Sequence, residues 1–173
     1  MLWTNRQDEV LEVLDVRPGD RVLEVGFGPG GLLRLLVSRT EAAHIVGVDP
    51  SPTMRAAATR PNHAAVRSGR MTLVLGTAER TGLADQSVDR VASVNNVDLW
   101  SDLEAGMREL HRVVRPGGKV VVAWHGGSSP GRIERRLRMP EAKLARIEGC
   151  MRRVFTDTAR DRLSTLDVFT AVR

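Results

Sequence analysis

Short apolar runs alternate with longer amphipathic segments through most of this chain, and that alternation restricts the fold more than any other feature. The apolar runs predict strands at Arg21–Val25, Ile45–Val48, Met71–Leu75, Arg90–Val94 and Lys119–Trp124. Helices are expected at Gly30–Arg39, Ser51–Thr59 and Leu103–Val114, after a first helix that carries Val10 and Leu14. Strands joined through helices require right-handed crossovers, so the pattern predicts an α/β fold with a mostly parallel sheet and helices on both faces.

The pattern is weaker after Gly126. The stretch GGSSPG is expected to be a loop, Pro140–Phe155 a helix, and Leu166–Val172 a final strand. A chain of 173 residues fits one domain, so we expect a single domain over 1–173.

A glycine-rich turn, VLEVGFGPGG, follows the first predicted strand. Gly26, Gly28 and Gly31 satisfy the G-x-G-x-x-G pattern of dinucleotide sites, whereas Gly26, Gly28 and Gly30 behind an acid suit a different nucleoside. Glycines permit positive φ and close approach of a ligand, and the following helix offers free N–H groups. Asp49, at the end of the second strand, would face a ribose. NAD and other adenosine ligands therefore both remain possible from the loop alone.

Glu24 lies two residues before Gly26 on the strand that leads into the turn. A carboxylate there suits a ligand with a cationic end, such as an ammonium or sulfonium, and opposes a pyrophosphate at the helix N-terminus. The structural alternative is that Glu24 only pairs with a basic side chain such as Arg21.

Four motifs in order resemble the class I S-adenosylmethionine-dependent methyltransferases, in their small, type 11-like form. They are VLEVGFGPG, IVGVDPS, the pair GTAERTGLADQSVDRV and VNNVDLW around strand four, and ELHRVVRPGGKVVVAW, which together span roughly Arg17–Trp124. The resemblance implies a single-domain Rossmann-like fold with about seven strands, the last of them antiparallel. It also implies S-adenosyl-L-methionine as cofactor, S-adenosyl-L-homocysteine as product, and no metal.

Carried over by position, the resemblance assigns cofactor binding to one set of residues. The set is Glu24, Gly26, Phe27, Gly28, Gly30, Asp49, Pro50, Ser51, Met54, Thr77, Ala78, Glu79, Asn95 and Asn96. Thr77 is a departure, because the family commonly has an acid before the alanine to accept from the adenine amine; the Thr77 hydroxyl or Glu79 would substitute. On composition alone a methionine such as Met54 more often belongs to the core, so only its position favours cofactor binding. Asn95 and Asn96 would stand beside the sulfonium, or else cap the next helix.

On the acceptor side, the ends of strands four and five offer Asp98, Trp100, Trp124 and His125, and Trp3 could fold over the pocket. We expect Trp3, Trp100 and Trp124 to contact substrate, and His125 and Asp98 to be catalytic, with a structural His125 as the alternative. Enzymes similar to this family use an N-P-P-[YF] pattern beside strand four for planar amide or base nitrogens. No such pattern stands there in this sequence, which argues against methylation of an exocyclic base amine.

Basic residues concentrate between Gly131 and Arg153, where eight Lys or Arg face three Glu and account for the whole net charge of +5. Residues 126–155 are interpreted as a possible basic substrate lid, with a solvated helical face or a surface for an acidic partner as alternatives. The favoured substrate is a small molecule, and a homodimer is possible. The competing hypotheses are an RNA- or ribosome-directed methyltransferase, disfavoured by scarce aromatics in the basic stretch, and a cofactor-binding protein that does not methylate.

The remaining composition is that of an ordinary globular protein, 42% hydrophobic and 27% charged. The N-terminal sequence lacks the pattern of a secretory signal, no apolar run has the length of a membrane span, and Cys150 is the one cysteine. A cytoplasmic location is therefore expected.

Overall fold

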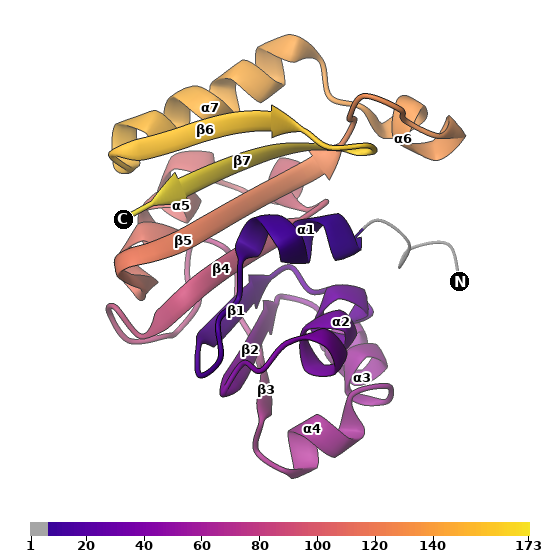
Figure 1. Cartoon of the computed structure of the whole chain (residues 1–173), viewed down its shortest axis with the longest axis vertical. Helices are drawn as coiled ribbons and strands as arrows, with labels where there is room; N and C mark the ends of the chain where they lie inside the picture. The colour runs from indigo at the N-terminus through magenta and orange to yellow at the C-terminus, as the bar shows by residue number, and fades with distance from the viewer. Residues whose placement is uncertain (1–6) are drawn as a thin grey trace.

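A computed structural model of the chain describes residues 7–173 and contains one seven-stranded sheet (Figure 1). Its strands are β1 (Arg21–Val25), β2 (His44–Asp49), β3 (Met71–Leu75), β4 (Val88–Val94), β5 (Val114–His125), β6 (Asp157–Arg162) and β7 (Leu166–Val172). Their order is β3-β2-β1-β4-β5-β7-β6. The first five run parallel, whereas β7 is antiparallel to both β5 and β6. The predicted α/β fold with an antiparallel last strand is confirmed.

Helices cover both faces of this sheet (Figure 1). They are α1 (Gln7–Leu14), α2 (Gly31–Arg39), α3 (Pro52–Thr59), α4 (His63–Arg67), the 3₁₀ helix η1 (Val97–Leu99), α5 (Leu103–Val113), α6 (Arg132–Leu137) and α7 (Glu141–Val154). Side chains of α1 to α4 pack in one core, with Leu14, Leu33 and Ala58 among them. Side chains of α5 and α7, including Leu110 and Met151, form the core on the other face. Among residues 7–173, no helix has the length and hydropathy needed to cross a bilayer.

Helix starts follow the caps that the sequence offers. The Ser51 hydroxyl accepts a hydrogen bond from the backbone N–H of Met54 (3.2 Å), with Pro52 at the first helical position. Asp102 likewise accepts from the N–H groups of Glu104 and Ala105 at the start of α5. These caps fix α3 and α5 where they begin, at the carboxyl ends of β2 and β4.

Four elements were not predicted: α4, η1, α6 and β6. Strand β6 has the sequence DTARDR, whose charged composition is typical of a loop. It is the strand at one edge of the sheet. Arg160 of this strand reaches Glu141 of α7 and lies 5.6 Å from the centre of the Phe169 ring. The polar character of β6 is therefore explained by an edge position, where charged side chains are satisfied at the surface.

Candidate functional site

A cavity of about 520 Å³ opens at the carboxyl ends of β1, β2 and β4. Twelve predicted site residues line it: Gly26, Gly28, Asp49, Pro50, Ser51, Met54, Thr77, Ala78, Glu79, Asn95, Asn96 and Trp100. In an open parallel sheet, this edge is where ligands bind beside the point at which strand order reverses. Here the reversal falls between β1 and β4, because β2 and β3 lie on one side of β1 and β4 on the other.

Asp49 joins two sides of this cavity. Its Oδ2 accepts a hydrogen bond from the Gly28 N–H (2.9 Å), and its Oδ1 accepts one from the Ser51 N–H (2.9 Å). The residue is 6% exposed, yet each carboxylate oxygen has a second lone pair for a further donor. Asp49 is therefore held in one orientation between the glycine turn and the start of α3, with acceptor capacity left over.

The glycine turn has the backbone geometry that requires glycine. Gly26, Gly28 and Gly30 have φ angles of 72°, 51° and 84°, all in the left-handed region. The Gly26 N–H donates to the carbonyl of Val48 (2.7 Å), which ties the turn to the end of β2. A Cβ on Gly26 would lie 2.4 Å from the Asn96 side chain. Backbone conformation and close approach both exclude a side chain at this position.

Glu24 lies beneath the turn and does not line the cavity. It is 2% exposed, its Oε2 is buried without a hydrogen-bond partner among residues 7–173, and the Leu33 backbone donates to the carboxylate. Burial, reinforced by the nearby Asp49 charge, raises the pKa of Glu24 well above its usual value. The predicted alternative partner, Arg21, instead directs its Nε to the Ser87 carbonyl (3.0 Å). Glu24 is thus a buried carboxylate at the N-terminal turn of α2.

Asn96 connects three parts of the cavity wall. Its amide donates to the Val25 carbonyl (2.8 Å), and its Oδ1 accepts from Ser93 Oγ (3.0 Å) and from Trp100 Nε1 (2.7 Å). The capping alternative is wrong for Asn96, because its side chain makes no cap hydrogen bond to η1. Asn95 adopts a positive φ of 57°, and its Oδ1 is buried with no partner in the described part of the chain.

Trp100 is fixed from its other side by a small residue. A Cβ on Gly106 would lie 2.5 Å from the Trp100 ring, so glycine at this position of α5 permits the indole to lie against the helix. With the hydrogen bond to Asn96, this contact makes Trp100 a fixed wall of the cavity. Ser101 and Leu99, which the sequence reasoning did not select, line the cavity beside it. Their position beside Trp100, with Leu99 directly before it in VNNVDLW and Ser101 directly after it, was the available indication.

Glu79 lines the cavity but is already engaged. Its Oε1 accepts from Ser101 Oγ (3.0 Å) and from the Asp102 N–H (3.0 Å). Burial alone would raise the pKa of Glu79, but these hydrogen bonds and one from Thr77 lower it on balance. Glu79 is therefore ionised near neutral pH and joins the loop after β3 to the start of α5.

Several predicted residues lie outside the cavity lining. Phe27 is 3% exposed and packs in the core, and Gly30 ends the turn against Ala58 of α3. Asp98 forms an ion pair with Lys143 (2.8 Å) and faces a second, smaller cavity. Trp3 lies outside the described residues.

The two predicted residues at the end of β5 also lie away from the cavity. Trp124 donates its Nε1–H to the Leu137 carbonyl (2.8 Å), which attaches the end of α6 to β5. His125 is 8% exposed and stacks edge-on against Trp124, with 5.8 Å between ring centres. Burial lowers the pKa of His125, partly opposed by Glu134, so the ring is neutral near pH 7. The geometry favours the structural alternative for His125 over a catalytic role.

Comparisons with known proteins agree with one another. Residues 23–122 match the family described as "Methyltransferase domain". The chain is similar to the uncharacterized methyltransferase YdaC of Bacillus subtilis, with 36% identity over 69% of this chain and 61% of that protein. It is also similar to 2-methyl-6-phytyl-1,4-hydroquinone methyltransferase of Arabidopsis thaliana, with 31% identity over 68% of this chain and 34% of the relative. Both alignments thus cover less than two thirds of the relative's own length.

Among solved structures, phosphoethanolamine N-methyltransferase 2 of Haemonchus contortus, in complex with S-adenosyl-L-methionine, superimposes with a TM-score of 0.79. The superposition covers 99% of this chain and 52% of that one, at 20% identity. At that identity, the likeness shows a shared fold. The family model and the relatives therefore identify a methyltransferase domain, and the solved structure has the same fold. The cavity at the carboxyl edge of the sheet agrees with this family.

Proposed function

Because the chain belongs to the class I S-adenosylmethionine-dependent methyltransferases, we propose that it transfers the methyl group of S-adenosyl-L-methionine to O, N or C of a small-molecule metabolite. The observation that carries this proposal is the position of Asp49, which is fixed at the cavity edge and retains lone pairs for two ribose hydroxyls.

The cavity residues fit this cofactor by their chemistry. Pro50, Met54 and Ala78 provide apolar walls suited to an adenine ring, and the Thr77 hydroxyl is available at the same edge. The buried Oδ1 of Asn95, a residue that lines the cavity, is an acceptor without a partner in residues 7–173, and the buried Oε2 of Glu24, beneath the glycine turn, is another. Unpartnered acceptors near a cavity favour a cationic ligand over a pyrophosphate, because each is stabilised by a donor.

When bound, the cofactor supplies an electrophilic methyl group on a sulfonium, so the chain's own task is alignment and exclusion of water. Asn96 and Trp100 form a fixed wall where the methyl group would face an acceptor. Among the cavity-lining residues, the ionisable groups are Asp49 and Glu79, and both already accept backbone hydrogen bonds. We therefore expect positioning of the acceptor to contribute more to the rate than general-base catalysis by His125 or Asp98.

Calorimetric titration with S-adenosyl-L-methionine, S-adenosyl-L-homocysteine and NAD tests the cofactor assignment. Both sulfur nucleosides should bind, and Asp49→Ala should weaken them by about 1–3 kcal/mol through the unpaired ribose hydroxyls. The matched control is Asp85→Ala, which removes an exposed carboxylate paired with Arg112 away from the cavity. Binding of NAD with no response to either sulfur nucleoside would overturn the assignment.

The acceptor class needs a separate measurement. Transfer of a labelled methyl group should be detected with a panel of small acids, alcohols and amines and be absent with RNA. Steeply salt-dependent RNA binding together with RNA methylation would replace the small-molecule substrate with a nucleic acid. Tight cofactor binding without transfer to either group would instead favour a binding protein that does not methylate.

A further inference from the structure

A second cavity of about 160 Å³ adjoins the first and shares Trp100 and Ser101 with it. It lies between η1, the start of α5 and the first half of α7. Its volume is small for a complete ligand pocket, but it suits one chemical group of a ligand whose other end reaches the larger cavity. Because Trp100 is fixed by Asn96 and Gly106, the boundary between the two cavities is a defined wall.

Positive charge predominates around this second cavity. Lys143 and Arg146 both line it, three residues apart on α7 and therefore on one face of that helix. Asp98 is the one acidic residue in the lining, and it pairs with Lys143 at 2.8 and 3.0 Å. Within residues 7–173, Arg146 has no carboxylate within 4 Å. One guanidinium thus faces the cavity without an anionic partner.

The remaining walls are apolar. Met139 and Ile147 are 5% and 4% exposed, and the Trp100 ring lines both this cavity and the larger one. A cationic rim over apolar walls suits a group that combines an apolar body with one negative charge. A neutral or cationic group in this cavity would form no ion pair with Arg146.

We propose that this second cavity is the part of the acceptor site that binds an anionic group of the methyl acceptor, a carboxylate or a phosphate, through Arg146 and Lys143. The inference rests on the proposed methyltransferase function, because it places the acceptor beside the wall that Trp100 forms. Asp98 then lowers the affinity for that anionic group, because it competes with the group for Lys143. Its role is therefore in recognition of the acceptor.

Small probes of matched shape can test this on the full-length chain: phenyl phosphate, benzoate and the neutral benzyl alcohol. Binding is followed by the indole N–H resonance of Trp100 in ¹⁵N-labelled protein, assigned with Trp100→Phe. We expect an anionic probe to shift this resonance and to bind at least about fivefold more tightly than benzyl alcohol. The stronger of the two anionic probes distinguishes a phosphate site from a carboxylate site. Equal affinity for benzyl alcohol, or no binding of either anion, would overturn the proposal.

Charge variants separate this site from general surface charge. Arg146→Gln should weaken the anionic probe at least about fivefold, while Arg153→Gln, an exposed position on the same helix, should change it less than about twofold. Asp98→Asn should tighten binding by releasing Lys143, whereas Asp85→Asn, with the same charge change elsewhere, should not. Equal effects within either pair would contradict the assignment.

The same variants distinguish this inference from the proposed function. Affinity for S-adenosyl-L-methionine, measured by calorimetry, should be unchanged in Arg146→Gln. If the wild-type chain binds the anionic probe through Arg146 but does not bind the cofactor, the proposed function fails and the anion site remains. If the chain binds the cofactor and Arg146→Gln leaves probe binding unaltered, the anion site fails and the proposed function remains.

Discussion

The Trp100 indole donates a hydrogen bond of 2.7 Å to Asn96 Oδ1, and this contact fixes the wall shared by the two cavities. The same Asn96 amide holds the carbonyl of Val25 at the end of β1. One side chain therefore links the end of β1 to Trp100. Substitutions close to the Asn96 amide should therefore destabilise the fold more than similar substitutions farther from it.

Gly26→Ala should destabilise the fold more than Gly28→Ala. Both positions have positive φ, but a Cβ at Gly26 would lie 2.4 Å from Asn96, whereas a Cβ at Gly28 meets nothing within 4 Å. Strain alone predicts a loss of about 1–3 kcal/mol at Gly28, and overpacking adds about 1–3 kcal/mol at Gly26. Denaturant unfolding of the two variants measures the difference. Equal losses would show that Asn96 moves aside without cost.

Glu24→Gln should raise the melting temperature at pH 8 by a few degrees. The pKa of Glu24 is raised by burial, so its favourable contribution is present below the usual value of 4.5 and is lost as the pH rises. Glutamine keeps an acceptor for the Leu33 N–H but carries no charge to bury. Thermal melts at pH 5 and pH 8 should show a smaller decline for the variant than for the wild type. A variant that is less stable at pH 8 would contradict this explanation.

The ionised Glu109 should stabilise the fold at neutral pH, so the free energy of unfolding should fall in acid as this group is protonated. Although burial raises its pKa, hydrogen bonds from Arg112 and Thr81 lower the pKa to about 2. A depressed carboxyl pKa stabilises the fold above the usual value of 4.5, and that contribution is lost as the pH falls toward 2. We expect Glu109→Gln to lose roughly 1–3 kcal/mol at pH 7 and much less at pH 3, measured by urea unfolding. The exposed Glu104→Gln serves as control and should change little at either pH.

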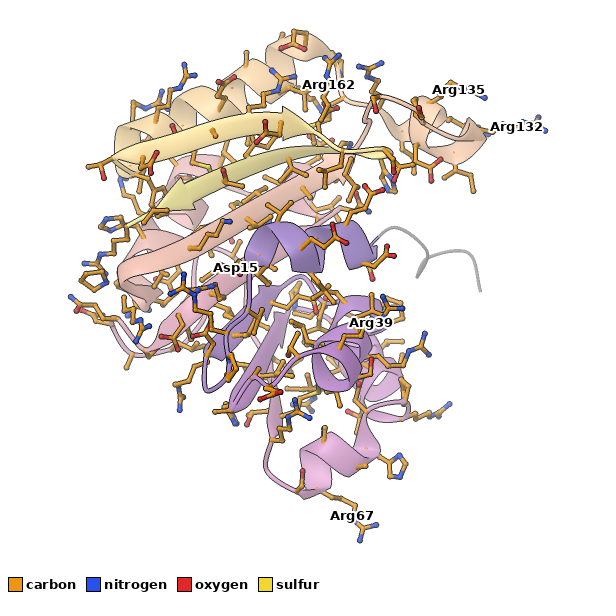
Figure 2. All side chains as sticks on the ribbon, in the orientation of Figure 1. Asp15, Arg39, Arg67, Arg132, Arg135 and Arg162 are labelled. Carbon is orange, nitrogen blue, oxygen red and sulfur yellow. The ribbon has the colours of Figure 1, made fainter. Side chains whose placement is uncertain are left out.

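Within the basic segment 126–155, proposed as a lid, α6 is the part to test, because side chains of α7 pack in the core. Arg132 and Arg135 project from α6 away from the sheet (Figure 2), and none of its residues is buried. Arg135→Glu with Arg136→Glu should raise the KM for the acceptor at least about fivefold, because the charge facing an acidic substrate is reversed. Cofactor affinity should stay within about twofold. Unchanged turnover of the native acceptor would eliminate the lid.

Much of the fold could be predicted because its elements repeat local patterns. The five parallel strands and the start of α3 follow from apolar runs and from Ser51 before Pro52. Strand β6 could not be predicted in this way, because its sequence DTARDR has neither the apolar run nor the apolar alternation on which such predictions rest. The short α6 buries no side chain, so it too has no apolar pattern to reveal it.

The candidate site was predictable where position along a strand determines position in space. Asp49, Gly26 and Gly28 meet because the ends of parallel strands share one edge of the sheet. The hydrogen bond between Asn96 and Trp100 depends on rotamers and on the space at Gly106, which no spacing rule specifies. Likewise, Arg146 joins the site only because α7 packs beside η1, a contact between distant segments.

The charged edge strand β6 affects whether two molecules of this protein can associate edge to edge. Along β6, Arg160 and Arg162 flank Asp161, and both arginines interact with Glu141 of α7. A neighbouring molecule that added a strand here would have to displace these ion pairs, so β6 resists continuation of the sheet from chain to chain. At the opposite edge, β3 carries the apolar sequence MTLVL, and Leu75 is 45% exposed. In concentrated solution, strand-to-strand aggregation should therefore begin at β3, and a lysine in place of Leu75 should suppress it.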